Sequence, residues 1–117
     1  MTKRTKGTFN RLIHNALEQT NGYITKSFGV FDTGSTPLRW QVTHKASGYR
    51  INTLECKTLK ETLANLARVE PLVSWDHPDL KSLCIANKCE AQTIADICRN
   101  APNTPKSNYV TREAYSL

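Results

Sequence analysis

The residue types best suited to chemistry in this chain are four cysteines and three histidines. Cys84, Cys89 and Cys98 lie close together with His77 upstream, but the gaps between the cysteines are four and eight residues, without a C-x2-C pair. Structural zinc sites usually take their ligands from such close pairs. Cys84 and Cys98 also fall on apolar helical stripes, where a free thiol packs as a small hydrophobe. We therefore expect reduced cysteines, no metal and no cofactor.

Nucleophilic catalysis would need Cys56 or a serine beside a histidine and an orienting acid. His44, His77 and Asp76 are available, but the sequence has no P-loop, dinucleotide fingerprint, H-E-x-x-H motif or nucleophile elbow. Asp76-His77-Pro78 is typical of a helix start, in which the carboxylate caps and proline occupies the first turn. The sequence therefore predicts a protein that is not an enzyme, without a catalytic residue.

Sixteen lysine and arginine residues outnumber ten aspartate and glutamate residues, so the formal net charge is +6. A basic balance favours polyanionic partners, because bound cations neutralise phosphates and release counterions. Lys3, Arg4 and Lys6 contribute three of these charges from a terminal segment that is not expected to form a fixed surface. Nucleic acid is the first class of partner that the composition indicates.

The composition predicts one cytoplasmic domain over residues 1–117. The chain is 38% hydrophobic, which is enough for one modest core in 117 residues. No stretch approaches the ~20 apolar residues of a membrane-spanning helix, so we expect no membrane partner. The basic first residues are not followed by the apolar run of a signal peptide.

Apolar spacing predicts an α+β fold that begins with a helix over residues 8–19. Three antiparallel strands should follow, at about 23–31, 38–45 and 49–52, and the last two should form a hairpin whose polar side faces solvent. Thr58 and Glu61 form a capping box that begins the next helix, which Pro71 ends. The helix predicted over residues 8–19 would have His14 on its solvated side. Its apolar stripe would consist of Phe9, Leu12, Ile13, Ala16 and Leu17.

A helical hairpin should follow as an extension of the domain over residues 71–100, before an irregular tail over 101–117. Its second helix should bury Ala91, Ile94, Ala95 and Cys98. The αβββα unit over 8–70 should hold the core, whose predicted members are Leu12, Ile13, Leu17, Phe28, Leu38, Trp40, Val42, Ile51, Leu59, Leu63 and Leu66.

The order of helix, three strands and helix over residues 8–70 resembles the double-stranded RNA-binding domain. The second helix of that family begins with lysines that face phosphates, and Lys57 and Lys60 stand at approximately those positions. On a helical wheel these lysines and Arg68 project away from the apolar stripe, so their charges could reach a row of phosphates. The resemblance therefore implies duplex RNA as a partner.

Two other nucleic-acid surfaces are compatible with the sequence. A helix-turn-helix over 80–100 would place its turn at Asn87-Lys88, although an ordinary helical hairpin fits the same pattern. The polar side of the strands could read base edges in a major groove, although solvated sheets carry the same alternation. That side consists of Arg39, Gln41, Thr43, Lys45, Arg50 and Asn52.

We therefore predict a non-enzymatic protein that binds duplex RNA or DNA through a basic surface. The alternative is a protein partner, because small chains of this kind resemble phage or mobile-element accessory proteins that inhibit or redirect a host protein. In that case the basic face would dock on an acidic protein groove, with Trp40, Trp75 or Tyr109 as anchors. The predicted binding residues are Lys57, Lys60 and Arg68, supported by Arg39, Lys45 and Arg50.

Overall fold

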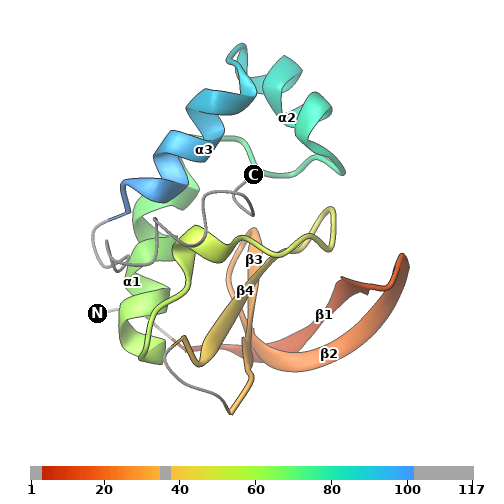
Figure 1. Cartoon of the computed structure of the whole chain (residues 1–117), viewed down its shortest axis with the longest axis vertical. Coiled ribbons are helices and arrows are strands. Elements are labelled where there is room, and N and C mark those ends of the chain that lie inside the picture. The colour runs from red at the N-terminus through yellow and green to blue at the C-terminus, as the bar shows by residue number, and fades with distance from the viewer. Residues whose placement is uncertain (1–3, 35–37, 102–117) are drawn as a thin grey trace.

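The computed structural model describes residues 4–34 and 38–101. Within these residues the chain forms four antiparallel strands, in the spatial order β1-β2-β3-β4, and then three α-helices (Figure 1). The α+β class is confirmed, but the predicted N-terminal helix followed by three strands is wrong. The elements are β1 (Lys6–Ile13), β2 (Ala16–Ile24), β3 (Phe28–Asp32), β4 (Trp40–His44), α1 (Leu59–Val69), α2 (Leu80–Asn87) and α3 (Ala91–Arg99), with 3-10 turns η1 (Asn52–Leu54) and η2 (Glu70–Leu72).

A β-hairpin occupies the segment for which the sequence predicted the first helix. β1 and β2 pair in register along their full length, and Ile13 lies opposite Ala16. His14 and Asn15 form the turn between them with positive φ angles of 49° and 67°. A two-residue turn with both φ angles positive matches the twist of paired strands. The apolar residues at helical spacing therefore belong to two strands on either side of this turn.

The predicted strand over 23–31 is two strands. β2 ends at Ile24 and β3 begins at Phe28, because Thr25 closes a tight turn in which its N–H donates to the Phe28 carbonyl at 2.9 Å. The predicted strand over 49–52 is reduced to one antiparallel bridge between Thr43 and Arg50. The chain does reverse direction after β4 as expected, but it then turns into η1.

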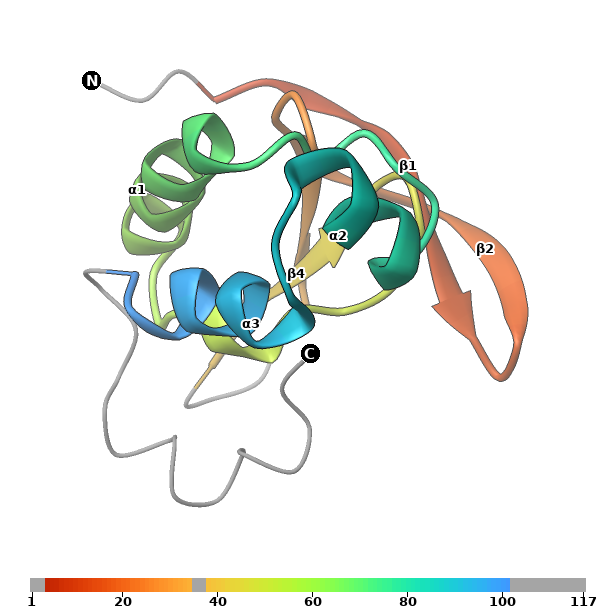
Figure 2. The same ribbon diagram turned by 90° about the horizontal axis from the view of Figure 1, so that it is seen from above.

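The β1–β2 hairpin curves across the sheet (Figures 1 and 2). β2 pairs with β3 only at Tyr23 and Ile24, and beyond these residues the hairpin bends until the Leu12 N–H meets the Gly48 carbonyl at 2.9 Å. The hairpin covers the face of the sheet that lies opposite to α1. The sequence predicted that this face would be exposed to solvent. Thr43 is consequently buried and Gln41 is half-buried.

Helix α1 closes the other face of the sheet. The Thr58 hydroxyl accepts the Glu61 N–H at 3.1 Å, which confirms the capping box. The apolar side of α1 packs on β3 and β4 in one core cluster. Of the predicted core, the residues that are buried are Phe28, Leu38, Val42, Ile51, Leu59, Leu63 and Leu66. Leu12, Ile13 and Trp40 are half-buried, and the prediction for Leu17 is wrong, because it is 61% exposed on the hairpin.

Helices α2 and α3 follow the sheet as a pair. α2 begins three residues later than expected, because Asp79 and not Asp76 caps it by accepting the Ser82 N–H at 2.7 Å. α3 buries Ile94, Ala95 and Cys98 as predicted, whereas Ala91 is exposed. The predicted tail lies outside the described residues beyond Ala101. No helix in the described ranges is long and apolar enough to cross a membrane.

Docking of the hairpin requires a glycine on β3. A Cβ atom at Gly29 would lie 2.4 to 2.5 Å from three atoms of the Phe9 ring, which is closer than real contacts allow. We expect Gly29→Ala to lower the free energy of unfolding by about 1 to 3 kcal/mol, as overpacking does. Urea denaturation measures this loss. In a Phe9→Ala background the same substitution should cost much less, and an equal cost in both backgrounds would contradict docking of Phe9 on β3.

Candidate nucleic-acid interface and neighbouring cavity

The three cations predicted on the helix lie on the outer side of α1. Lys57 precedes the capping residue, and Lys60 and Arg68 follow within the helix; all three are exposed. Their side chains point away from the buried positions, such as Leu63 and Leu66. None of the three has a hydrogen-bond or ion-pair partner among the described residues. These charges are held on one rigid element and are available to an external anion.

The cations predicted on the sheet are engaged within the protein. Arg39 binds Asp32 through two contacts of 2.7 Å, and this guanidinium lowers the pKa of the Asp32 carboxyl to about 2. Arg50 binds Glu55 through contacts of 2.8 and 2.7 Å. The Lys45 ammonium donates to the Thr25 carbonyl at 2.7 Å. The structure therefore does not bring these residues together as a free basic face.

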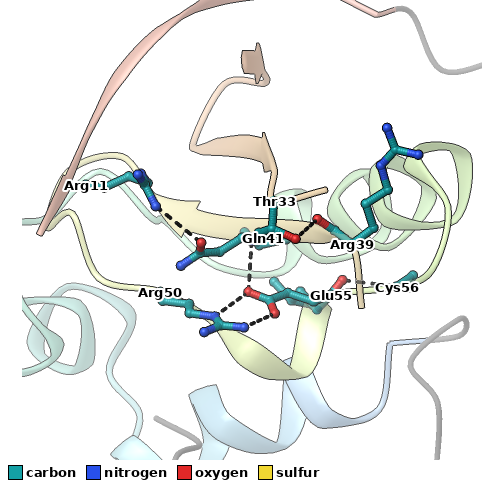
Figure 3. A network of polar contacts seen from close by, with 9 residues as sticks. Arg11, Thr33, Arg39, Gln41, Arg50, Glu55 and Cys56 are labelled. Atoms are coloured by element: carbon teal, nitrogen blue, oxygen red, sulfur yellow. Dashed lines mark hydrogen bonds and ion pairs between the residues drawn. The ribbon is translucent and has the colours of Figure 1, made fainter. Parts of the chain in front are cut away.

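Glu55 is fully buried, and its carboxylate accepts hydrogen bonds from the Arg50 guanidinium and from the backbone of β4 (Figure 3). Besides both contacts from Arg50, its carboxylate accepts the Val42 N–H of β4 at 3.0 Å. Hydrogen bonding to this carboxylate raises the pKa of Arg50. The sequence contains both partners five residues apart, but their pairing depends on η1 turning back toward β4. Within the fold, the Arg50 guanidinium is therefore paired with a buried carboxylate.

A second carboxylate ties the β2–β3 turn to the end of α1. Glu70 accepts the Ser27 N–H at 2.7 Å and the Thr25 hydroxyl at 3.0 Å. This contact joins residues more than 40 positions apart in the sequence. The exposed Lys26 at the centre of the turn is therefore held beside the C-terminal end of α1.

Further cations gather at the same turn. The Ile24 N–H donates to the Thr5 carbonyl at 2.8 Å, which brings the exposed Arg4 and Lys6 to this end of the sheet. Lys45 reaches it from β4 through its contact with Thr25. The sequence did not reveal this group, because residues 25–27 were assigned to the interior of a strand. The clue was Lys26, which interrupts the strand alternation.

A cavity of about 460 Å³ lies between the loop after β4 and helix α2. Pockets that take small ligands have volumes of about 300 to 1,000 Å³. Most of the wall is apolar, and the exposed Tyr49 stands at its rim. The lining residues are His44, Ser47, Tyr49, Ile51, Trp75, Asp79, Leu80, Lys81 and Leu83.

His44 closes the inner end of the cavity and is neutral. Its Nε2 lies 2.5 Å from the Trp75 carbonyl, which only accepts, so Nε2 carries the proton. Nδ1 therefore accepts from the Ser47 hydroxyl at 2.8 Å, and the Ser47 oxygen also accepts the Tyr49 N–H at 3.1 Å. Burial lowers the pKa of His44. These polar groups bond to one another, so the inner cavity suits an apolar group.

The other candidate catalytic residues are Cys56, His77 and Asp76. The Cys56 thiol accepts a hydrogen bond from the Asn65 amide at 3.2 Å, and burial raises the pKa of this thiol to about 11. His77 is half-buried near Ser74, and Asp76 is exposed. The four cysteines are free thiols. Within residues 4–34 and 38–101, no three histidine, cysteine or acidic side chains lie close enough to hold a metal.

Of the two proposed tryptophan anchors, Trp75 is buried and Trp40 is half-buried. Trp75 is 2% exposed, donates its ring N–H to the Val69 carbonyl at 3.1 Å, and packs edge-on against Phe28. Trp40 is half-buried against Tyr23, and Tyr109 lies outside the described residues. The interpretation of Trp75 as an anchor is therefore wrong, because this side chain joins the sheet to the helical layer.

Comparisons with protein-family models, curated proteins and solved structures found no significant match for this chain. The resemblance to the double-stranded RNA-binding domain rested on a helix followed by three strands. The structure has a hairpin in place of that helix, so this order of elements is absent from the described residues.

The two arginine–carboxylate pairs provide a matched test of burial. Glu55→Gln should lower the free energy of unfolding by about 2 to 3 kcal/mol. This loss is near the lower limit for breaking a buried ion pair, because the Arg50 side chain is 46% exposed and can be hydrated by water once its partner is gone. Asp32→Asn breaks an exposed pair and should leave stability unchanged within error. Urea denaturation at neutral pH compares them. An equal loss of unfolding free energy in the two variants would contradict the larger contribution of the buried pair.

Burial of neutral His44 makes stability depend on pH. Between its ordinary pKa of about 6.5 and its lower folded value, the unfolded chain binds a proton that the folded chain does not. The free energy of unfolding should therefore fall as pH falls from 7.5 to 5.5, by at most about 1.4 kcal/mol per unit. Denaturation at several pH values measures the slope. A His44→Asn variant that keeps the slope would show that another group produces it.

Proposed function

We propose that this protein binds nucleic acid without catalysis, through a basic surface formed by the outer side of α1 and the adjoining β2–β3 turn. The observation that carries the proposal is the contrast between two sets of cations. Arg39 and Arg50 are neutralised by carboxylates, whereas those on α1 have no such partner among the described residues. The members of this basic surface are Lys57, Lys60, Arg68, Lys26, Lys6 and Arg4.

The chemistry of these residues favours recognition of the phosphate backbone. The six lysine and arginine side chains of this surface can approach phosphates, and each neutralised phosphate releases counterions. Reading of base edges needs arginine or amide groups held in a groove, and Arg39 and Arg50 already bind carboxylates. The proposal is therefore binding to duplex RNA or DNA with little sequence preference.

Binding to labelled duplex RNA, duplex DNA and single strands over a series of salt concentrations tests the proposal. Lys57→Ala with Lys60→Ala should leave the fold intact and reduce the log–log salt slope by at most about two. Arg39→Gln with Lys88→Asn removes the same net charge from other elements and is the matched control. This control should change the slope much less, because Arg39 is already paired.

Two outcomes would overturn the proposal. Equal effects of both double variants would mean that only the net charge matters and that α1 is not a binding surface. Absence of binding to every nucleic acid at low salt would favour the alternative partner, an acidic protein groove of the kind that accessory proteins of phages occupy. Such an interface is less sensitive to salt than phosphate binding.

A further inference from the structure

The C-terminal end of α2 holds two cysteines in a specific backbone arrangement. Lys88 ends the helix in the left-handed conformation, with a φ angle of 52°. Its N–H donates to the Ile85 carbonyl at 3.3 Å, and the Cys89 N–H donates to the Cys84 carbonyl at 3.1 Å. This pair of bonds defines the Schellman motif, in which the side chains at the positions of Cys84 and Cys89 commonly contact each other.

The direct backbone bond limits the distance between these two cysteines. With a 3.1 Å bond from the Cys89 nitrogen to the Cys84 oxygen, standard bond lengths separate the two Cα atoms by at most about 7 Å, and any bend shortens the path. A disulfide needs about 4.4 to 6.8 Å between Cα atoms. Both side chains also pack against the same core cluster. The backbone therefore holds the two Cα atoms close enough for a bond between the side chains.

The other two thiols differ in their surroundings. Cys98 is buried and its pKa is raised to about 12, and the pKa of Cys56 is raised to about 11. At neutral pH neither forms an appreciable amount of thiolate, which is the reactive form. Cys84 and Cys89 are half-buried and within reach of a reagent in solution. The fold thus divides the cysteines into an inert pair and an accessible pair.

We propose that Cys84 and Cys89 are a thiol modification site that closes reversibly into a disulfide by exchange with a small disulfide such as oxidised glutathione. This inference is independent of nucleic-acid binding. One protein thiolate attacks the glutathione disulfide, forms a mixed disulfide and expels one glutathione thiolate. The second protein thiolate then attacks the protein sulfur of the mixed disulfide and expels the other. Two protein thiols are oxidised, and the two released glutathiones carry the electrons and protons.

Mass spectrometry of the full-length native protein after incubation with oxidised glutathione tests the site. The wild type should lose two free thiols with little retained glutathione, and peptide mapping should link Cys84 to Cys89. Cys84→Ser and Cys89→Ser each remove one partner, so each should retain one glutathione on the remaining cysteine. The retained adduct should be at least about tenfold higher in these variants than in the wild type.

Two results would overturn the proposal. One is a wild type that retains glutathione on either cysteine as fully as the single variants do. The other is a mapped disulfide that includes Cys56 or Cys98. The mapping needs only the wild-type protein, so it decides the matter even if a serine variant fails to fold. Dithiothreitol should restore both thiols, because the bond forms by reversible exchange.

Discussion

The buried carboxylate of Glu55 is the interaction on which the junction of sheet and helices depends. A charge removed from water is costly unless it is paired and hydrogen-bonded. Glu55 meets this requirement with two donors from Arg50 and the backbone N–H of Val42. The contact fixes η1 against β4, and η1 sets the direction in which the chain leaves for α1. One side chain therefore connects the outer strand to the helix that covers the core.

A second acid repeats this role at the other end of α1. Glu55 lies shortly before the helix and binds the backbone of β4, whereas Glu70 follows the helix directly and binds the β2–β3 turn. The helix is thus attached at both ends, which holds Lys60 and Arg68 at fixed positions. The acids used in this way lie at the ends of the helix or beneath it. A third acid, Glu61, is exposed on the first turn of α1, where its carboxylate accepts the Thr58 hydroxyl at 3.0 Å.

The sequence predicted correctly those elements, α1 and β4, whose patterns depend only on residues close together in the chain. The capping box of Thr58 and Glu61 and the apolar stripe behind it identified α1, and with it the outward direction of Lys57 and Lys60. The alternation around Val42 identified β4. Both signals depend only on neighbouring residues, so packing elsewhere in the chain did not alter them.

The first hairpin was missed because a polar residue occupies its inner face. Arg11 lies 4.1 Å over the Phe31 ring and bonds to Thr20 and Gln41, so β1 lacks the alternation of apolar and polar residues expected of a strand. His14 also gives no standard turn signal. The engagement of Arg39 and Arg50 was equally hidden, since their acidic partners approach only after the chain has folded.

The closure of the sheet edges has a consequence for self-association. An open row of backbone groups on an outer strand is a template for strand addition by another chain and for aggregation. On β4 the Val42 N–H donates to the Glu55 carboxylate, and the Val42 carbonyl accepts the Ile51 N–H. On β1 the Leu12 N–H is bound by Gly48. At these positions the backbone groups of the two outer strands already have partners within the fold, so they are not free to pair with a strand of another chain.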